Sequence, residues 1–148
     1  MKLNTIWILG LALLVLGACS GDRIYENYHG IESQNWNVID TIHFELPKHP
    51  VGHTILGIKY TQDYKYRNLY VRYVLKDSLN QVLESQLLDI PLFEASSGKP
   101  LGKGFGSTYT KYDTLPLRNL DYHSVSFTQY MRVDTLPGIE AIGIKLVH

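Results

Sequence analysis

Apolar and polar residues alternate with a period of two along most of this chain, which is the pattern of β-strands with one buried face. The clearest run is 69–76, in which Leu69, Val71, Tyr73 and Leu75 alternate with mostly polar positions. Turn residues such as Pro and Gly separate the runs, so each predicted strand ends at a turn. The other predicted strands lie within 38–46, 53–61, 124–131 and 142–146.

The stretch 82–93 fits two patterns. Apolar residues between 79 and 87 have helical spacing, whereas Leu88, Ile90 and Leu92 alternate as in a strand. Pro91 would break a helix interior, so we favour a strand. Residues 95–106 are rich in Gly and are expected to form a loop, and the polar segment 108–122 receives no clear assignment.

Short strands without a long amphipathic helix predict an all-β protein, an antiparallel β-sandwich of jelly-roll or Greek-key type. We expect this domain to span residues 36–148. The polar segment before it, residues 19–35, is expected to be the N-terminus of the mature protein and a tether, with an irregular edge strand within 20–34.

The N-terminus has the features of a targeting sequence, which we predict to be a lipoprotein signal peptide over residues 1–18. The apolar run Ile6–Leu16 spans roughly 16 Å as a helix, too short to cross a bilayer. It ends at Leu16-Gly17-Ala18-Cys19, the pattern of a bacterial lipobox, and Cys19 is the only cysteine. Lipidation of Cys19 with palmitate-type chains would be a stable membrane anchor. An ordinary signal peptide and an uncleaved anchor are the alternatives.

The residue after the lipobox cysteine bears on location. Ser20 stands where an Asp often marks retention in the inner membrane, which favours the outer membrane. The 14 cations and 14 anions give a net charge of zero, so the chain lacks the basic surplus of a nucleic-acid binder. One cysteine excludes an intrachain disulfide and a multi-cysteine zinc site.

Motifs for catalysis or cofactor binding are weak. Gly102-Lys103-Gly104-Phe105-Gly106 lacks the spacing of a phosphate-binding loop and is expected to be a turn. His49 and His53 would share a helix face, but Pro50 between them disfavours a helix. There is no Gly-x-Ser-x-Gly elbow. We therefore predict no catalytic residue, no metal site and no cofactor, and expect that the protein is not an enzyme; a small hydrolase is a minor alternative.

Tyrosine is the strongest hint of a binding surface, with 11 in the chain. Tyr60 and Tyr73 share stripes with aliphatic residues, so we expect Tyr64, Tyr66 and Tyr70 to be the better exposed rings. Exposed rings could stack on sugars or bind a protein partner. The alternative is that they are ordinary half-buried strand residues.

Three sets of motifs resemble one family. The first is the lipobox with an aromatic tether and Trp36, and the second is Tyr64-Lys65-Tyr66-Arg67-Asn68-Leu69. The third joins the Gly-rich segment 98–106 to Gln129-Tyr130-Met131-Arg132 and the residues through Ile144. Together they resemble the gliding motility lipoprotein family GldH, with Pro100 standing where that family often has an aromatic residue.

The resemblance implies an envelope lipoprotein of the Bacteroidetes group without enzymatic activity, serving gliding motility or a linked secretion apparatus. We expect it to lie on the periplasmic face of the outer membrane and to dock on other envelope proteins there. An envelope-anchored carbohydrate-binding module that uses the exposed tyrosines is the alternative function.

Overall fold

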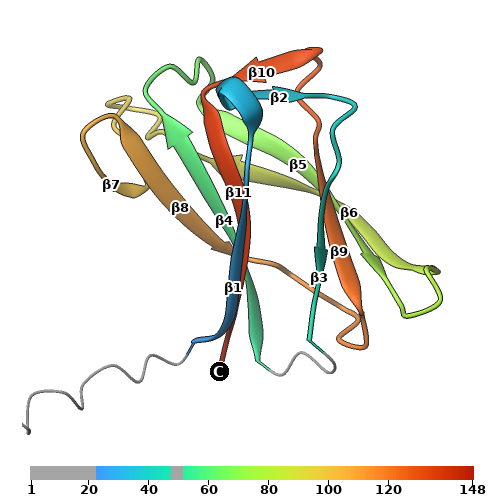
Figure 1. Cartoon of the computed structure of the whole chain (residues 1–148). Helices are drawn as coiled ribbons and strands as arrows, with labels where there is room; N and C mark the ends of the chain where they lie inside the picture. The colour runs from blue at the N-terminus through green and yellow to red at the C-terminus, as the bar shows by residue number, and fades with distance from the viewer. Residues whose placement is uncertain (1–22, 48–51) are drawn as a thin grey trace, which may run out of the picture.

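The computed structural model describes residues 23–47 and 52–148, and the chain there forms two antiparallel sheets packed face to face (Figure 1). One sheet has the strand order β1-β11-β4-β8-β7 and the other β3-β9-β5-β6, while β2 and β10 form a small pair at one end. The strands are β1 (Arg23–Gly30), β2 (Asn35–Asn37), β3 (Ile42–Glu45), β4 (His53–Thr61), β5 (Asn68–Lys76), β6 (Val82–Pro91), β7 (Lys103–Phe105), β8 (Thr108–Thr114), β9 (Ser124–Gln129), β10 (Thr135–Pro137) and β11 (Ile139–Val147), with a 3-10 turn η2 (Glu32–Gln34) before β2.

The order of the long strands is that of a jelly roll. Leaving out the short β2, β7 and β10, the chain contributes four strands to each sheet, β1-β11-β4-β8 and β3-β9-β5-β6, and crosses repeatedly between them. The predicted all-β sandwich is therefore confirmed, and the strand order is that of the jelly-roll variant.

The core lies between the two sheets and is built from the inward face of each strand. Leu69, Val71, Tyr73 and Leu75 are all fully buried, as the period-two pattern predicts for β5. Neighbouring strands of one sheet add ring contacts, with Phe44 on β3 and Phe127 on β9 edge to face at 6.1 Å between centroids. Trp36 on β2 is also fully buried and closes one end of this core.

Most strand predictions are confirmed, and several regions differ. In the segment 38–46 the strand β3 begins only at Ile42, and the short strands β2 and β10 were not predicted. The ambiguous stretch 82–93 contains the strand β6, as favoured over a helix. The expected loop 95–106 includes the short strand β7, which forms a hairpin with β8. β8 itself was not predicted, because two of its three inward positions, Lys111 and Asp113, are charged and lie beyond the end of β7, at the edge of the sheet.

The N-terminal edge strand is part of the sandwich. β1 pairs with β11 from Arg23 to Gly30, so the sandwich includes residues before Trp36, in the segment expected to hold an edge strand. The signal peptide and Cys19 lie outside the described residues. Within the described residues, no helix has the length and apolar character needed to cross a membrane.

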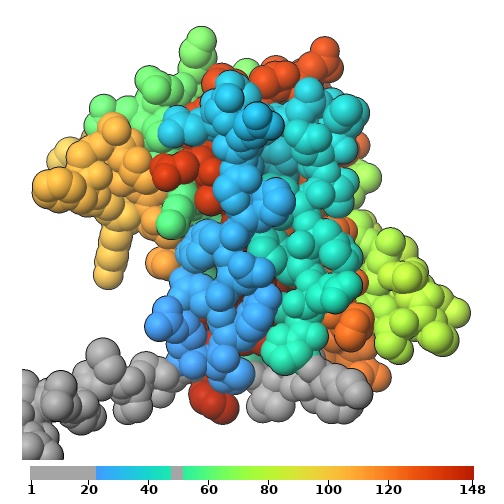
Figure 2. All heavy atoms as spheres, in the orientation of Figure 1, coloured from blue at the N-terminus to red at the C-terminus, as the bar shows by residue number. Residues whose placement is uncertain are grey.

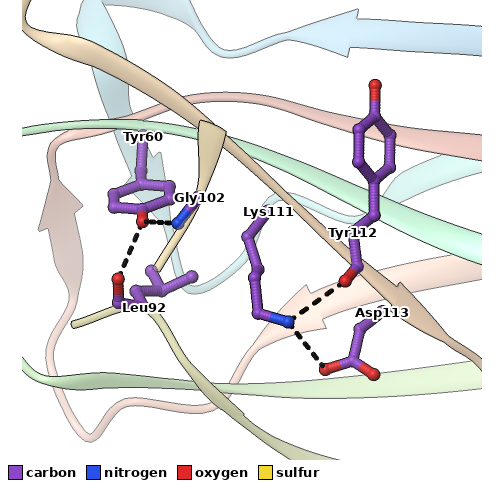
Figure 3. Close-up of polar contacts among 6 residues, drawn as sticks. All are labelled: Tyr60, Leu92, Gly102, Lys111, Tyr112 and Asp113. Atoms are coloured by element: carbon purple, nitrogen blue, oxygen red, sulfur yellow. Dashed lines mark hydrogen bonds and ion pairs between the residues drawn. The ribbon is translucent and has the colours of Figure 1, made fainter. Parts of the chain in front are cut away.

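A buried tyrosine fastens the long loop between β6 and β7 to the core. The Tyr60 hydroxyl donates to the Leu92 carbonyl at 2.7 Å and accepts from the Gly102 backbone N–H at 2.9 Å (Figure 3). Its ring also packs edge to face on Phe93, with centroids 5.4 Å apart. Both ends of the loop are thus held by one side chain from the central strand β4.

Candidate partner-binding groove

The loop after β9 is shaped by a buried glutamine. Gln129 is only 1% exposed, and its amide group accepts from the Met131 N–H and donates to the Val133 carbonyl, both at 2.8 Å. These bonds satisfy a polar side chain that would be costly to bury alone. They also hold Arg132 in a left-handed backbone conformation with φ of 53°. As a result, Tyr130 and Arg132 are presented at the surface.

The loop between β4 and β5 is anchored by Tyr64. This side chain is 4% exposed, and its hydroxyl donates to the Asn68 carbonyl at 2.8 Å. Its ring stacks on Phe93, 6.4 Å between centroids, and burial raises the pKa of its hydroxyl. Gly138 lies directly beside it, where a Cβ would come within 2.5 Å of the Tyr64 nitrogen. The anchor leaves the next tyrosine, Tyr66, on the outside.

These two loops border a groove with a volume of about 500 Å³, next to the outer face of the β3-β9-β5-β6 sheet. Its largest exposed side chains are Tyr66 (38%), Tyr70 (37%), Tyr130 (48%) and Leu87 (49%). Apolar, aromatic and cationic groups thus meet in one place. The groove is lined by Tyr66, Asn68, Tyr70, Leu87, Tyr130, Met131 and Arg132.

Local contacts hold the groove in shape. The backbone N–H of Tyr130 donates to the Tyr70 carbonyl at 2.8 Å, which continues the β5–β9 ladder by one residue. The Tyr70 N–H lies 3.1 Å from the Met131 sulfur. The Arg72 guanidinium lies 4.4 Å from the centroid of the Tyr130 ring, a cation–π arrangement that covers the ring on one side.

Two of the three predicted tyrosines meet in this groove. Tyr66 and Tyr70 are exposed as expected, whereas the expected exposure of Tyr64 is wrong, because its ring stacks on Phe93 and its backbone and Cβ lie against Gly138. Sequence reasoning missed Tyr130 and Met131 as part of this surface. Their alternation with polar residues indicated only a continuing strand, whereas β9 ends at Gln129.

A different tyrosine arrangement occupies the outer face of the other sheet. Tyr28, Gly143, Gly57 and Tyr112 stand opposite one another on β1, β11, β4 and β8. The Tyr28 ring lies over both glycines, because a Cβ on Gly143 would come within 2.3 Å of the ring and one on Gly57 within 2.5 Å of the hydroxyl. We call this row the tyrosine strap.

The strap is closed by polar and cation–π contacts. The Tyr28 hydroxyl donates to the Tyr112 hydroxyl at 3.2 Å, and the Lys59 ammonium lies 4.7 Å from the Tyr28 ring centroid. Burial, followed by the bond to Tyr112, raises the pKa of Tyr28. The Lys145 ammonium lies 5.6 Å from the Tyr112 ring centroid. All of these contacts join residues of the same sheet, so the strap stabilises the fold.

A carboxylate at the far end of β6 also has a structural role. Glu84 accepts from the Tyr73 hydroxyl at 2.6 Å and from the Gln86 amide at 2.8 Å. Its other oxygen accepts from the backbone N–H groups of Arg118 and Asn119 at 3.0 and 3.1 Å. Burial alone would raise the pKa of this carboxyl, but these hydrogen bonds outweigh it and lower the pKa below its ordinary value.

The described residues offer no group of three or more His, Cys, Asp or Glu side chains that could hold a metal ion. His49 lies outside the described residues, and His53 begins β4 with its side chain exposed. The Gly-rich segment 102–106, expected to be a turn, contains the strand β7 (Lys103–Phe105), and Gly106 begins the hairpin turn to β8.

Comparison with known proteins gives one family. Residues 23–146 match the family model described as GldH lipoprotein. No curated protein matches the sequence.

Three solved structures resemble the chain at low identity. The first is an adhesin domain of Lys-gingipain from Porphyromonas gingivalis, with 19% sequence identity and a TM-score of 0.30 over 72% of this chain and 61% of that chain. The second is the VP2 subviral particle of infectious bursal disease virus, with 7% identity and a TM-score of 0.31 over 84% of this chain and 34% of that chain. The third is tailspike protein 4 of bacteriophage CBA120, with 11% identity and a TM-score of 0.31 over 82% of this chain and 18% of that chain. The chain therefore spans less than two thirds of each of these proteins.

Proposed function

Because this chain belongs to the GldH lipoprotein family, a family related to gliding motility, we propose that it is a non-enzymatic, lipid-anchored protein that docks on another envelope protein through the groove of Tyr66, Tyr70 and Tyr130. The observation that carries the docking proposal is the convergence of three exposed aromatic rings in one groove. Such rings contribute much of the binding energy in protein interfaces while losing little side-chain entropy.

The chemistry of the groove supports a protein partner. Aromatic residues, Met and Arg are enriched at protein interfaces, and the groove combines Tyr130, Met131 and Arg132 with the aliphatic Leu87. The groove includes residues of the segments 64–69 and 129–132, which are two of the segments on which the family resemblance rests. A partner with an apolar side chain beside an acidic one would match this lining.

The test replaces the chromosomal copy by the Tyr70→Ala, Tyr130→Ala double variant in the source organism. We expect colony spreading, or secretion where the organism does not glide, to fall toward the level of the deletion strain while the amount of the protein stays unchanged. Phe105→Ala is the matched control, because Phe105 is an almost fully exposed ring on the β7 hairpin, outside the groove. A double variant that behaves like the wild type would refute docking through this groove.

Anchoring is proposed to occur through a lipid on Cys19, on the periplasmic face of the outer membrane. The family match to lipoproteins and the lipobox ending at Cys19 support it. Labelling with radioactive palmitate followed by membrane fractionation should give a labelled outer-membrane protein for the wild type and no label for Cys19→Ala. An unlabelled wild-type protein would refute the anchor, and a labelled inner-membrane protein would refute the location.

Carbohydrate binding is the second candidate, favoured by the same exposed rings together with the Asn68 amide and the Arg132 guanidinium at the groove. A glycan array probed with the purified protein distinguishes the two. Binding that disappears in the Tyr66→Ala variant would favour a sugar ligand over a protein partner.

A further inference from the structure

The strand β6 is an open edge of the β3-β9-β5-β6 sheet. Among the described residues no strand pairs with its far side, and Figure 1 shows it in yellow-green at the border of that sheet. An open hollow of about 770 Å³ lies beside its first half, between residues 83–86 and the loop 118–121. Open strand edges present unpaired backbone groups and recruit further strands.

The direction of the backbone groups follows from the ladder. Since the Tyr130 N–H donates to the Tyr70 carbonyl, the backbone groups of Tyr70 point toward β9. Those of its chain neighbours 69 and 71 therefore point toward β6, where they meet Ile90 and Leu88. The alternate β6 residues Ser85, Leu87 and Asp89 consequently direct their N–H and C=O groups outward.

The other sheet edges carry protective features. β3 and β7 have only four and three residues, and β1 has a register shift and an Arg23–Glu26 ion pair. On β8, beyond the end of β7, the Lys111 ammonium donates to the Tyr112 carbonyl at 3.1 Å and lies 4.0 Å from Asp113 (Figure 3). These are the devices by which natural sheets discourage strand addition.

β6 carries two of these devices near its start, a register shift with β5 between Val82 and Glu84 and the inward carboxylate of Glu84, and lacks them along the rest of its length. It has 10 residues, contains neither Lys nor Arg, and keeps a regular register with β5 from Glu84 to Pro91. Leu87, in the middle of its outward-directed residues, exposes 49% of its surface. Pairing is limited at the two ends of β6, by the register shift near Val82 and by Pro91, since proline has no N–H to donate.

The outward residues are complementary to themselves. In an antiparallel pair centred on Leu87, two copies of Leu87 face each other, and Ser85 of each copy faces Asp89 of the other. Each pair exchanges two backbone hydrogen bonds. The hydroxyl of serine suits the carboxylate of aspartate, the two leucines cover each other, and no like charges stand directly opposite.

From this self-complementary edge we infer that two copies of this chain associate through β6, with Leu87 on the twofold axis, to form one continuous eight-stranded sheet. Each copy contributes the same strand to the interface, as in an isologous dimer. The dimer joins the grooves of the two copies side by side across the Leu87 pair. The inference rests on the sheet edge and not on the proposed docking function.

Disulfide crosslinking of the full chain in its native membranes tests the register. Opposed residues of a hydrogen-bonded pair lie about 5.5 Å apart between Cα atoms, within the range of a disulfide. Leu87→Cys should therefore form a crosslinked dimer on oxidation. Ser85→Cys and Asp89→Cys should each remain uncrosslinked alone but crosslink when the two variants are expressed together. The wild type, which has only Cys19, is the control.

Two results for the cysteine variants themselves would overturn the inference. One is a Leu87→Cys chain that reacts with maleimide, which shows an accessible thiol, but does not crosslink. The other is equal crosslinking of all three single variants, which indicates random collision. Crosslinking to a different protein would likewise overturn it in favour of strand addition by a partner.

A charge-swap experiment gives an independent readout. In detergent, light scattering should give a dimeric mass for the wild-type chain and half that mass for Leu87→Lys and for Leu87→Glu, with unchanged circular dichroism. Mixing the two variants should restore the dimeric mass, since opposite charges then face each other. Tyr130→Ala should keep the dimer even if docking is lost. A monomeric wild type, or a mixture that stays monomeric, would refute the dimer.

Discussion

The outer faces of the two sheets use the same amino acid in opposite ways. In the tyrosine strap, the Tyr28 ring lies flat on Gly57 and Gly143 and its hydroxyl is committed to Tyr112. In the groove, Tyr66, Tyr70 and Tyr130 keep more than a third of their surface exposed. The two faces differ in what lies under the rings. In the strap, Gly57 and Gly143 have no side chains, so the Tyr28 ring can pack directly on the strand backbone. In the groove, the rings are carried partly on loops and border an open space. Tyrosine content alone therefore does not identify a binding surface.

Gly143→Ala should cause the largest loss of stability, because it places a methyl group where the Tyr28 ring packs on the backbone of β11. The new methyl group would come within 2.3 Å of the Tyr28 ring and displace it, with a loss of about 2–3 kcal/mol in the free energy of unfolding. Urea denaturation measures this loss, and hydrogen exchange should show β1 opening first.

Two controls sharpen this prediction. Gly30→Ala has no atom within 4 Å of the new Cβ and should change stability little. Adding Tyr28→Ala to Gly143→Ala should cost less than the sum of the two single changes, because the clash is then gone. Additive losses would show that the strap does not act as one unit.

Glu84→Gln should cause the second-largest loss of stability. It affects the hydroxyl of the buried Tyr73, which donates to the Glu84 carboxylate. Replacing the carboxylate weakens its charge-assisted bonds to Tyr73 and to the 118–119 backbone, with an expected loss of about 1.5–3 kcal/mol at neutral pH. Because the folded pKa of Glu84 is lowered, its contribution is present above the unfolded pKa of about 4.3 and is lost as the pH falls toward the folded pKa.

The measurement is the free energy of unfolding of wild type and variant between neutral and acidic pH. The two curves should converge as the pH falls, because protonation removes the same charge from the wild type. A gap that stays constant with pH would contradict the role of the ionised carboxylate. Asp89→Asn, on the same strand, is the matched control, since the amide can still accept from Asn68.

Tyr130→Ala should give the smallest effect on stability and complete the comparison. Its ring is half exposed and its main internal contact is the Arg72 guanidinium, a pair that contributes about 0.5–1 kcal/mol at an exposed site. Thermal unfolding followed by circular dichroism should therefore show a shift of a few degrees at most. A large shift would mean that this ring is structural, like that of Tyr28, and would weaken the groove as a binding surface.

Local pattern was enough to predict the central strands but not the surface they support. Period-two alternation correctly placed β4, β5, β6, β9 and β11, because each carries apolar residues at successive inward positions. β8 was missed because its inward Lys111 and Asp113 lie at the sheet edge, where charge is tolerated.

The candidate site was predicted only in part, since its geometry depends on contacts far apart in sequence. Tyr66 and Tyr70 were identified from their polar surroundings. The burial of Tyr64 depends on Phe93 and Gly138, and the position of Tyr130 depends on the buried amide of Gln129. Neither dependence leaves a local signature, and the same holds for the glycines under Tyr28.

The tyrosine strap also decides how the domain withstands tension. Residues 1–22 precede Arg23, so any pull transmitted along them reaches the sandwich at the first residue of β1, an edge strand bonded on one side only (Figure 2, blue). Backbone hydrogen bonds loaded from such an end would break one after another. At Tyr28 the pull meets a ring that must be lifted from two neighbouring strands and separated from a third, which makes this edge strand harder to peel from the sheet.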